Sequence, residues 1–310
     1  MNMTSNPFEF VAGQQDSGTR IDLFLVSRID GFSRSAVQKL LENGNITCND
    51  VTVGKNYKLR CGDRVAVFVP EQKQTALIPQ DIPLEIIYED DDLLVVNKPK
   101  GMVVHPAAGN EENTLVNALL FHCGEHLSRI NGEIRPGILH RIDKNTSGLL
   151  AVAKNDAAHL FLAEQIQAHR FTREYRAVVY GVVKQDSGVW NAPLGRSRSD
   201  RKKIAVNGEN PREAVTHYEV LQRFPRFTYM KFLLETGRTH QIRVHCAYAG
   251  HPVAGDDVYG PKKCFTELQG QCLHAKKLGF IHPATQAYME FDSELPAYFQ
   301  KFLLKAEKIT

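Results

Sequence analysis

The chain has 310 residues, of which 43% are hydrophobic and 24% are charged, a composition typical of a globular protein longer than one average domain. It has no run of about 18 uncharged apolar residues and no signal-peptide pattern at its start, so we expect a cytoplasmic protein with no membrane partner. Six scattered cysteines without CxxC pairs favour reduced thiols. His240 and His245 lack the HExxH spacing, and we predict no metal site.

Positive charge is concentrated in the middle of the chain. The net charge is only +3, yet residues 135–250 contain 19 Lys and Arg against 10 Asp and Glu. This asymmetry indicates a face that binds a polyanion, although a charge excess is also typical of an ordinary solvated surface.

The N-terminal segment shows two short helices followed by strands. Apolar residues at helical spacing predict a helix over residues 19–29. Ser33 is a predicted N-cap of a second helix, which should end near Gly44. Two turn pairs, Asn49-Asp50 and Gly62-Asp63, then separate three short strands.

This order over residues 13–70, with the stretch "SRSAVQKLLENGNITCND", resembles the alpha-L RNA-binding fold first known from a small-subunit ribosomal protein. The resemblance implies that the second helix presents basic and polar side chains to RNA. A small helical cap with ordinary surface charges is the alternative interpretation. The implied contacts are Arg34, Ser35, Gln38 and Lys39.

Residues 71–83 follow Pro70, contain two further prolines and show no periodicity, which predicts a linker before a second domain at 84–310. Strands outnumber helices there and do not alternate with them, so we predict an α+β domain on a mostly antiparallel mixed sheet. No glycine-rich phosphate loop occurs. The predicted strands are two around an acidic turn at 89–92, "LHRID", "GLLAVAKN", "REYRAVVYGVV", 213–222, 227–236 and 251–254; the predicted helices are "THQIRVHCAYAG" and one from an Asp156 cap to about His169.

Asp143 is a single acid among bases in "RPGILHRIDKNTSGLLAVAKN". It is the last residue of the predicted strand "LHRID", a position that suits a reactive side chain held by a rigid scaffold. An arginine close to it would keep the carboxylate charged. Arg141, Arg238 and Arg243 are candidates for this partner, while an isolated surface turn remains the alternative.

Three separated stretches resemble the pseudouridine synthases that modify large-subunit ribosomal RNA and transfer RNA. They are "GILHRIDKNTSGLLAVAKN", "REYRAVVYG" and "LETGRTHQIRVHCAYAGHPVAGDDVYG". With flanking motifs the resemblance covers about residues 84–300. It implies an isomerase that breaks the bond between uracil N1 and the ribose, turns the base and rejoins it through C5, without metal or organic cofactor.

The resemblance also assigns roles. Asp143 would act on the ribose, either by attacking C1′ or by taking a proton from C2′, and no second acid is needed. Tyr175 would stack on the uracil and assist proton removal from C5, and Arg243 would pair with Asp143. Arg141 would fill the gap left by the flipped base, and Leu273 would line the pocket. For Tyr175 and Leu273, plain core packing is the alternative.

The stretch "GRSRSDRKK" at residues 195–203 contains five bases and one acid. We interpret it as a loop that contacts phosphates, with a solvated basic loop as the alternative. The residues concerned are Arg196, Arg198, Arg201, Lys202 and Lys203.

The combination of the N-terminal module with "HPAAGN" and "PLGRSRSDRKK" resembles the type D synthases of the ribosomal large subunit. The expected partner is therefore large-subunit (23S) ribosomal RNA, possibly in a pre-ribosomal particle, bound by a monomer. The alternatives are a tRNA pseudouridine synthase of the same family and a noncatalytic RNA-binding ribosome-assembly factor. A metal hydrolase lacks the ligand spacing it would need.

Overall fold

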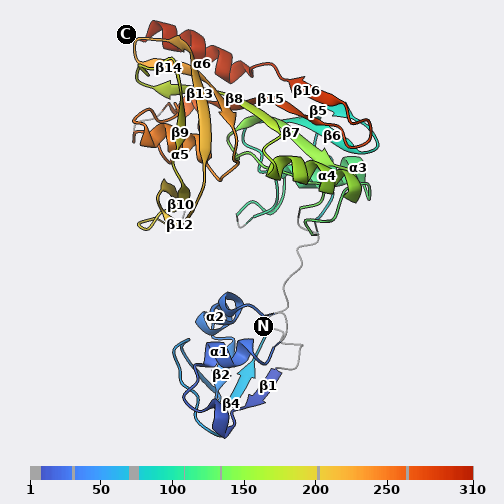
Figure 1. The fold of residues 1–310 in the computed structure, drawn as a ribbon, viewed down its shortest axis with the longest axis vertical. Coiled ribbons are helices and arrows are strands. Elements are labelled where there is room, and N and C mark those ends of the chain that lie inside the picture. Colours follow the sequence, from blue (N-terminus) through green and yellow to red (C-terminus); the bar gives the residue numbers. More distant parts are fainter. Residues whose placement is uncertain are drawn as a thin grey trace. The chain divides into compact units, whose positions relative to one another are not determined.

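The computed structural model describes residues 8–29, 32–69, 77–107, 109–132, 135–200, 203–262 and 265–309. The chain divides into two compact units, residues 1–76 and 77–310 (Figure 1). None of the described helices is both long enough and apolar enough to span a bilayer.

The N-terminal unit combines two helices with a four-stranded antiparallel sheet in the order β1-β4-β2-β3. Ser33 accepts a hydrogen bond from the amide of Ala36 and is the N-cap predicted for the second helix. Asn49 and Asp50 both have positive φ, as the predicted two-residue hairpin turn requires. The elements are β1 (Phe8–Val11), η1 (Gln14–Asp16), α1 (Ile21–Val26), α2 (Arg34–Glu42), β2 (Ile46–Cys48), β3 (Val51–Thr52) and β4 (Arg64–Val67).

Strand β1 was not predicted. It lies before residue 13, the first residue of the predicted N-terminal domain. Its register on β4 pairs Phe8 with Val67 and Phe10 with Val65. The four residues of β1, FEFV, alternate only briefly between apolar and polar types, so hydrophobic periodicity carries little signal there.

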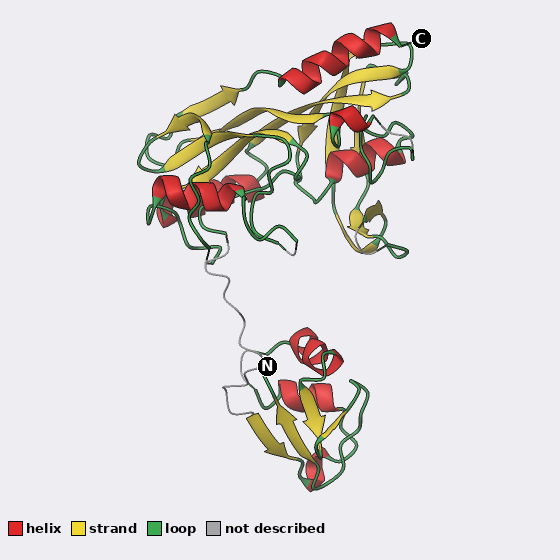
Figure 2. Cartoon of the chain, turned by 180° about the vertical axis from the view of Figure 1, so that it is seen from behind, coloured by secondary structure: helices red, strands yellow, loops and turns green. Residues whose placement is uncertain are grey.

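The larger unit is an α+β domain, as predicted. Its nine-stranded sheet runs β5-β6-β7-β15-β8-β14-β13-β9, with β16 also paired to β15, and it is the long set of yellow arrows in Figure 2. Its pairs are antiparallel except β7 with β15. The elements are β5 (Glu85–Glu89), β6 (Leu93–Lys98), α3 (Leu115–Cys123), β7 (Ser147–Ala153), α4 (Asp156–Gln167), β8 (Thr172–Tyr180), β9 (Ser187–Asn191), β10 (Leu194–Arg196), β11 (Ile204–Val206), β12 (Glu209–Arg212), β13 (Val215–Arg223), β14 (Phe227–Leu234), α5 (Gln241–Tyr248), η2 (Thr266–Leu268), β15 (Leu273–Ile281), β16 (Tyr288–Asp292) and α6 (Ala297–Lys308).

The sheet is buried on both faces. On one face, alternate residues of β6 and β7 pack with α3, and the same cluster includes Tyr175 and Leu273. On the other face, the intervening residues of these strands pack with Leu162 of α4, while α6 covers Val178 of β8. Tyr175 therefore lies on the same face of the sheet as α3.

Three sequence predictions are wrong in detail. "LHRID" (139–143) is a loop that follows an isolated bridge between Ile138 and Val152, and residues 251–254 form only a bridge through Val253. The N-cap of α4 is Asn155, whose side chain accepts from the Ala158 amide, and Asp156 is the first helical residue. Both residue types are good caps, and only the backbone angles decide between them.

Gly148, the glycine of the "TSG" motif, lies where a side chain would not fit. It has φ +117°, and a Cβ at this position would lie 2.2 Å from the carbonyl oxygen of Ala275 on the adjacent parallel strand. A side chain there would push β7 away from β15 at the base of the loop that carries Asp143.

We expect Gly148→Ala to lower the free energy of unfolding by more than about 3 kcal/mol, because it adds both backbone strain and a backbone clash. Gly250→Ala is a matched control, since Gly250 has φ +83° but open space around its Cβ, and it should cost only about 1–2 kcal/mol. Urea unfolding of both variants tests this. Equal losses would contradict the clash.

Candidate active site

A cavity of about 380 Å³ in the larger unit brings together residues from five segments. They come from the loop before β7, residues 166–169 at the end of α4, strand β8, the loop and helix at 234–243, and the start of β15. All five residues implied for the catalytic pocket line it: Arg141, Asp143, Tyr175, Arg243 and Leu273.

Asp143 lies in the loop between residues 139 and 146, just before β7, instead of at the end of a strand. Its side chain is 23% exposed. Its carbonyl accepts from the Thr146 amide at 3.0 Å, and the Thr146 hydroxyl accepts from Gln271 Nε2 at 3.0 Å. The loop is therefore fixed at both its backbone and its flanking side chains.

Lys98 at the end of β6 holds the same loop from below and is only 1% exposed. Its ammonium donates to the carbonyls of Pro99 and Met102, both at 2.8 Å, and of Lys144 at 3.2 Å. Burial lowers the pKa of Lys98 to about 7, although the negative charge of Asp143 raises it. This lysine was not identified from the sequence. The available signal was its position in "NKPKG", directly after the apolar run of β6.

The Lys98 pKa predicts a pH-dependent stability. The folded pKa lies below that of an unfolded lysine, so between pH 7 and 10.5 the unfolded chain binds a proton that the folded chain has released. Wild-type stability should therefore rise with pH across this window, by up to about 1.4 kcal/mol per pH unit from this group. Lys98→Met should remove that rise. Urea unfolding at pH 7 and 9.5 measures it, and identical slopes in both proteins would contradict the prediction.

Arg243 on α5 joins Asp143 to a second acid. Its Nη1 donates to Asp143 Oδ2 at 3.0 Å, while Nε and Nη2 bind both carboxylate oxygens of Asp256 at 2.7 and 2.9 Å. Asp256 is fully buried and also accepts from two backbone amides. Burial would lower the pKa of Arg243, but Asp256 and Asp143 outweigh it and raise the pKa. The guanidinium is thus a fixed positive charge aimed at Asp143.

His240 approaches Asp143 from the other side, with Nε2 3.8 Å from Oδ1. Burial lowers its pKa, so the ring is neutral near pH 7. The Tyr259 hydroxyl accepts from the Ile204 amide and lies within hydrogen-bond distance of His240 Nδ1, at 2.8 Å. This contact positions the ring, whose Nε2 faces Asp143. Asp256, His240 and Tyr259 were not identified as site residues from the sequence.

Tyr175 and Leu273 form an apolar wall beside this polar cluster. They lie on the neighbouring strands β8 and β15 and are 7% and 4% exposed. Burial raises the pKa of Tyr175 to about 12, and the Asp143 charge adds to this effect. The phenol is therefore neutral near pH 7. It offers a ring face and a hydroxyl to a ligand, and the basic phenolate form is disfavoured.

Arg141 is exposed at the rim of the cavity, two residues before Asp143. Its Nη2 donates to the Thr239 hydroxyl at 2.8 Å, which ties the rim to the loop before α5. Its long side chain reaches solvent from this anchored position.

The basic stretch 195–203 starts in β10 and returns at β11, in a small sheet of its own with β12. Arg196 and Arg198 are exposed, and Lys203 is half-buried. Arg201 and Lys202 lie outside the described residues. Because the Ile204 amide binds Tyr259, the loop is attached directly beside His240 and the cavity.

In the N-terminal unit, Arg34 and Gln38 of α2 both donate to the buried carboxylate of Asp22. Burial would raise the pKa of Asp22, but the hydrogen bonds from Gln38, Arg20 and Arg34 lower it to about 2. Ser35 lies 2.9 Å from Ser33 through their hydroxyls, and Lys39 is exposed. Two of the four residues expected to contact RNA thus also hold α2 onto α1.

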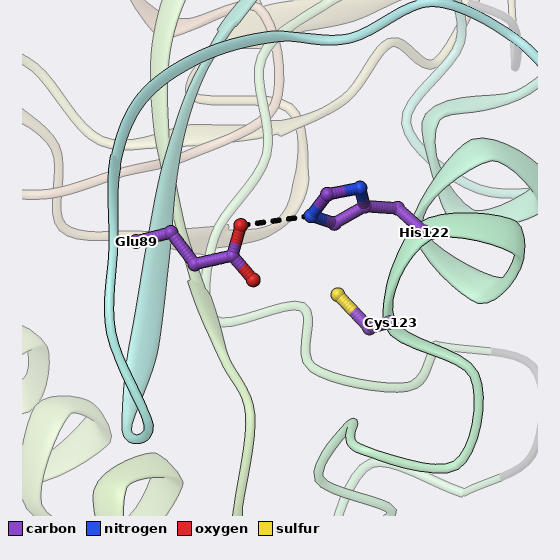
Figure 3. A group of neighbouring side chains, drawn as sticks. All are labelled: Glu89, His122 and Cys123. Atoms are coloured by element: carbon purple, nitrogen blue, oxygen red, sulfur yellow. Dashed lines mark hydrogen bonds and ion pairs between the residues drawn. The ribbon is translucent and has the colours of Figure 1, made fainter.

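Among the described residues, two groups of side chains of the types that bind metals lie away from this cavity. Within each group, the possible ligand atoms are all within 4.8 Å of one another. In the first, shown in Figure 3, Glu89 binds His122 at 2.8 Å, and its other oxygen binds Lys154 at 2.9 Å. Burial raises the pKa of the adjacent Cys123 thiol to about 11. Lys154 is thus a cation already on the glutamate. The second group is Asp90, Asp92 and His282.

The fold and the cavity together define a class of protein: an α+β enzyme with a carboxylate, held by an arginine, beside a tyrosine wall. The RNA pseudouridylate synthase family model matches residues 92–248. An uncharacterized RNA pseudouridine synthase of Bacillus subtilis is 50% identical over 94% of this chain and 95% of its own length. The ribosomal large subunit pseudouridine synthase D of Zymomonas mobilis is 46% identical over 91% of this chain and 92% of its own.

Among solved structures, the human RNA pseudouridylate synthase domain containing 1 matches with a TM-score of 0.57 and 26% identity, covering 74% of this chain and 97% of that one. The chain belongs to the RNA pseudouridine synthase family.

Proposed function

We propose that this enzyme isomerises specific uridines of large-subunit (23S) ribosomal RNA. Several relatives that are 39–46% identical over most of the chain are named ribosomal large subunit pseudouridine synthase D. The observation that carries the chemistry is the Asp143 carboxylate, 3.0 Å from the anchored guanidinium of Arg243 and beside Tyr175 in one cavity. We further infer a monomer working in the cytoplasm.

In this proposal the reaction needs one acid because neither the base nor the sugar is transferred to water. Asp143 acts on the ribose while the N1–C1′ bond breaks: as a nucleophile it bonds to C1′, and as a base it takes a proton from C2′. The uracil turns against Tyr175 and Leu273, and C5 bonds to C1′ as the bond from Asp143 breaks or as the proton returns to C2′. The C5 proton then leaves to solvent and N1 takes up a proton. Arg243 orients the carboxylate and stabilises its charged form before and after these steps.

RNA binding is proposed to involve both units. Residues 13–70 act as an alpha-L RNA-binding module through α2, and residues 84–310 contact phosphates through the loop that follows β10. Arg141, at the rim of the cavity, takes the place of the flipped base in the RNA stack. Affinity should then fall steeply with salt concentration.

Tritium release from RNA labelled at uracil C5 tests the proposal. Transcripts of large-subunit rRNA and tRNA are compared, followed by mapping of pseudouridines in rRNA from cells that lack the protein. Release from rRNA alone supports the proposed substrate, and release from tRNA alone replaces it with tRNA. Binding without release from any RNA would indicate a noncatalytic assembly factor.

A further inference from the structure

A second cavity, of about 510 Å³, lies directly beside the candidate active site. The two cavities share the wall formed by residues 139–141, the segment that leads to Asp143. Both volumes fall in the range typical of small-molecule sites. A ligand that crosses the rim at Arg141 would enter both. The other residues that line the second cavity are His105, Asn131, Gly132, Arg135 and Ile138.

His105 supplies a polar group that the described residues leave unpaired. Its side chain lines the second cavity, the residue is only 8% exposed, and no described residue forms a hydrogen bond with its Nδ1. Burial lowers its pKa to about 4, and the charges of Arg135 and Arg141 add to this effect. The ring is therefore neutral, with one donor and one acceptor nitrogen. Buried polar groups normally have partners, so a ligand is the natural partner here.

The rim of the second cavity is positively charged. Arg135 and Arg141 are both exposed, and none of the described residues that line the cavity is acidic. Exposed arginines without an acidic neighbour suit phosphate oxygens, which dominate protein contacts with nucleic acid. The cavity thus combines a phosphate-binding rim with a neutral hydrogen-bonding floor.

We propose that this second cavity binds the nucleotide adjacent to the target uridine, with His105 contacting its base and Arg135 its phosphate. The inference rests on the proposed function, because the uridine must occupy the cavity of Asp143. The neighbouring base is held apart from its stack, which keeps the uridine extruded while the reaction proceeds.

The test uses short hairpin transcripts of large-subunit rRNA whose C5 tritium the wild-type enzyme releases. Each is prepared intact and with an abasic nucleotide on the 5′ or the 3′ side of the target. His105→Ala should raise KM about 10-fold on intact RNA with kcat unchanged, and should have no effect on one of the two abasic RNAs. That loss of coupling distinguishes a base contact from a folding defect.

Arg135→Ala is the second variant, because it changes an exposed side chain and leaves the fold intact. It should raise KM on intact and abasic RNA alike. Arg129→Ala is its matched control, an exposed arginine nearby that lines neither cavity.

Several outcomes would overturn the second site. An unchanged KM for His105→Ala, or an equal rise on intact and both abasic RNAs, removes the base contact. Equal effects of Arg129→Ala and Arg135→Ala remove the assigned phosphate contact. If the wild-type enzyme releases tritium from no hairpin, both the proposed function and the second site fail. If the wild type releases tritium normally but the variants behave in one of these ways, only the second site is refuted.

Discussion

We expect the Asp143→Asn variant to release tritium from C5-labelled RNA at least about 10⁴-fold more slowly than the wild type while still binding the RNA. Asparagine has nearly the same shape, and Asp143 is partly exposed, so the fold should survive. The amide cannot attack C1′ or accept a proton from C2′. Release assays and gel-shift binding at the same salt concentration measure the two properties separately.

Asp257→Asn is the control for this experiment, because Asp257 is an exposed acid adjacent to Asp256 that does not line the cavity. It should release tritium at the wild-type rate. Undiminished release by Asp143→Asn would exclude this carboxylate from the chemistry.

The second large effect concerns Arg243. Arg243→Gln leaves the fully buried Asp256 without its bidentate partner, which should cost about 3–5 kcal/mol of stability. It also removes the donor to Asp143, so release should fall by about 10²–10³-fold. Urea unfolding and single-turnover release measure the two losses.

The double variant Arg243→Gln/Asp256→Asn separates stability from catalysis. It removes the unpaired buried charge, so most of the lost stability should return, while release should stay low because Asp143 still lacks its partner. Recovery of activity together with stability would mean that Arg243 acts only through folding.

Local sequence signals identified several elements correctly because their causes are local. A serine cap before an apolar helical stripe begins α2, and two residues with positive φ form the β2–β3 turn. The apolar run after Asp143 forms β7. The strand prediction for "LHRID" was wrong because so short a segment is equally compatible with a loop. In the structure this segment positions Asp143 and separates the two cavities.

The site residues divide in the same way. Asp143, Tyr175, Arg243, Arg141 and Leu273 were assigned through motif resemblance, and the structure brings all five to one cavity. Asp256 and His240 lie inside the matched motif too, but their types alone do not reveal a role. Asp256 was missed because its significance depends on complete burial against Arg243, and His240 because its place beside Asp143 depends on the fold that also brings it to Tyr259.

The sequence by itself determined the family and the α+β class, and its motif resemblance predicted Asp143 and its pairing with Arg243, because ordered motifs and periodic apolar residues are written along the chain. Only the tertiary structure decided what anchors Arg243 and that a second cavity opens beside the first. Asp143 and Arg243 are 100 positions apart, and such pairs meet only when strands distant in sequence pack side by side. Their distances and burial, which control charge and hydrogen bonding, are properties of that packing.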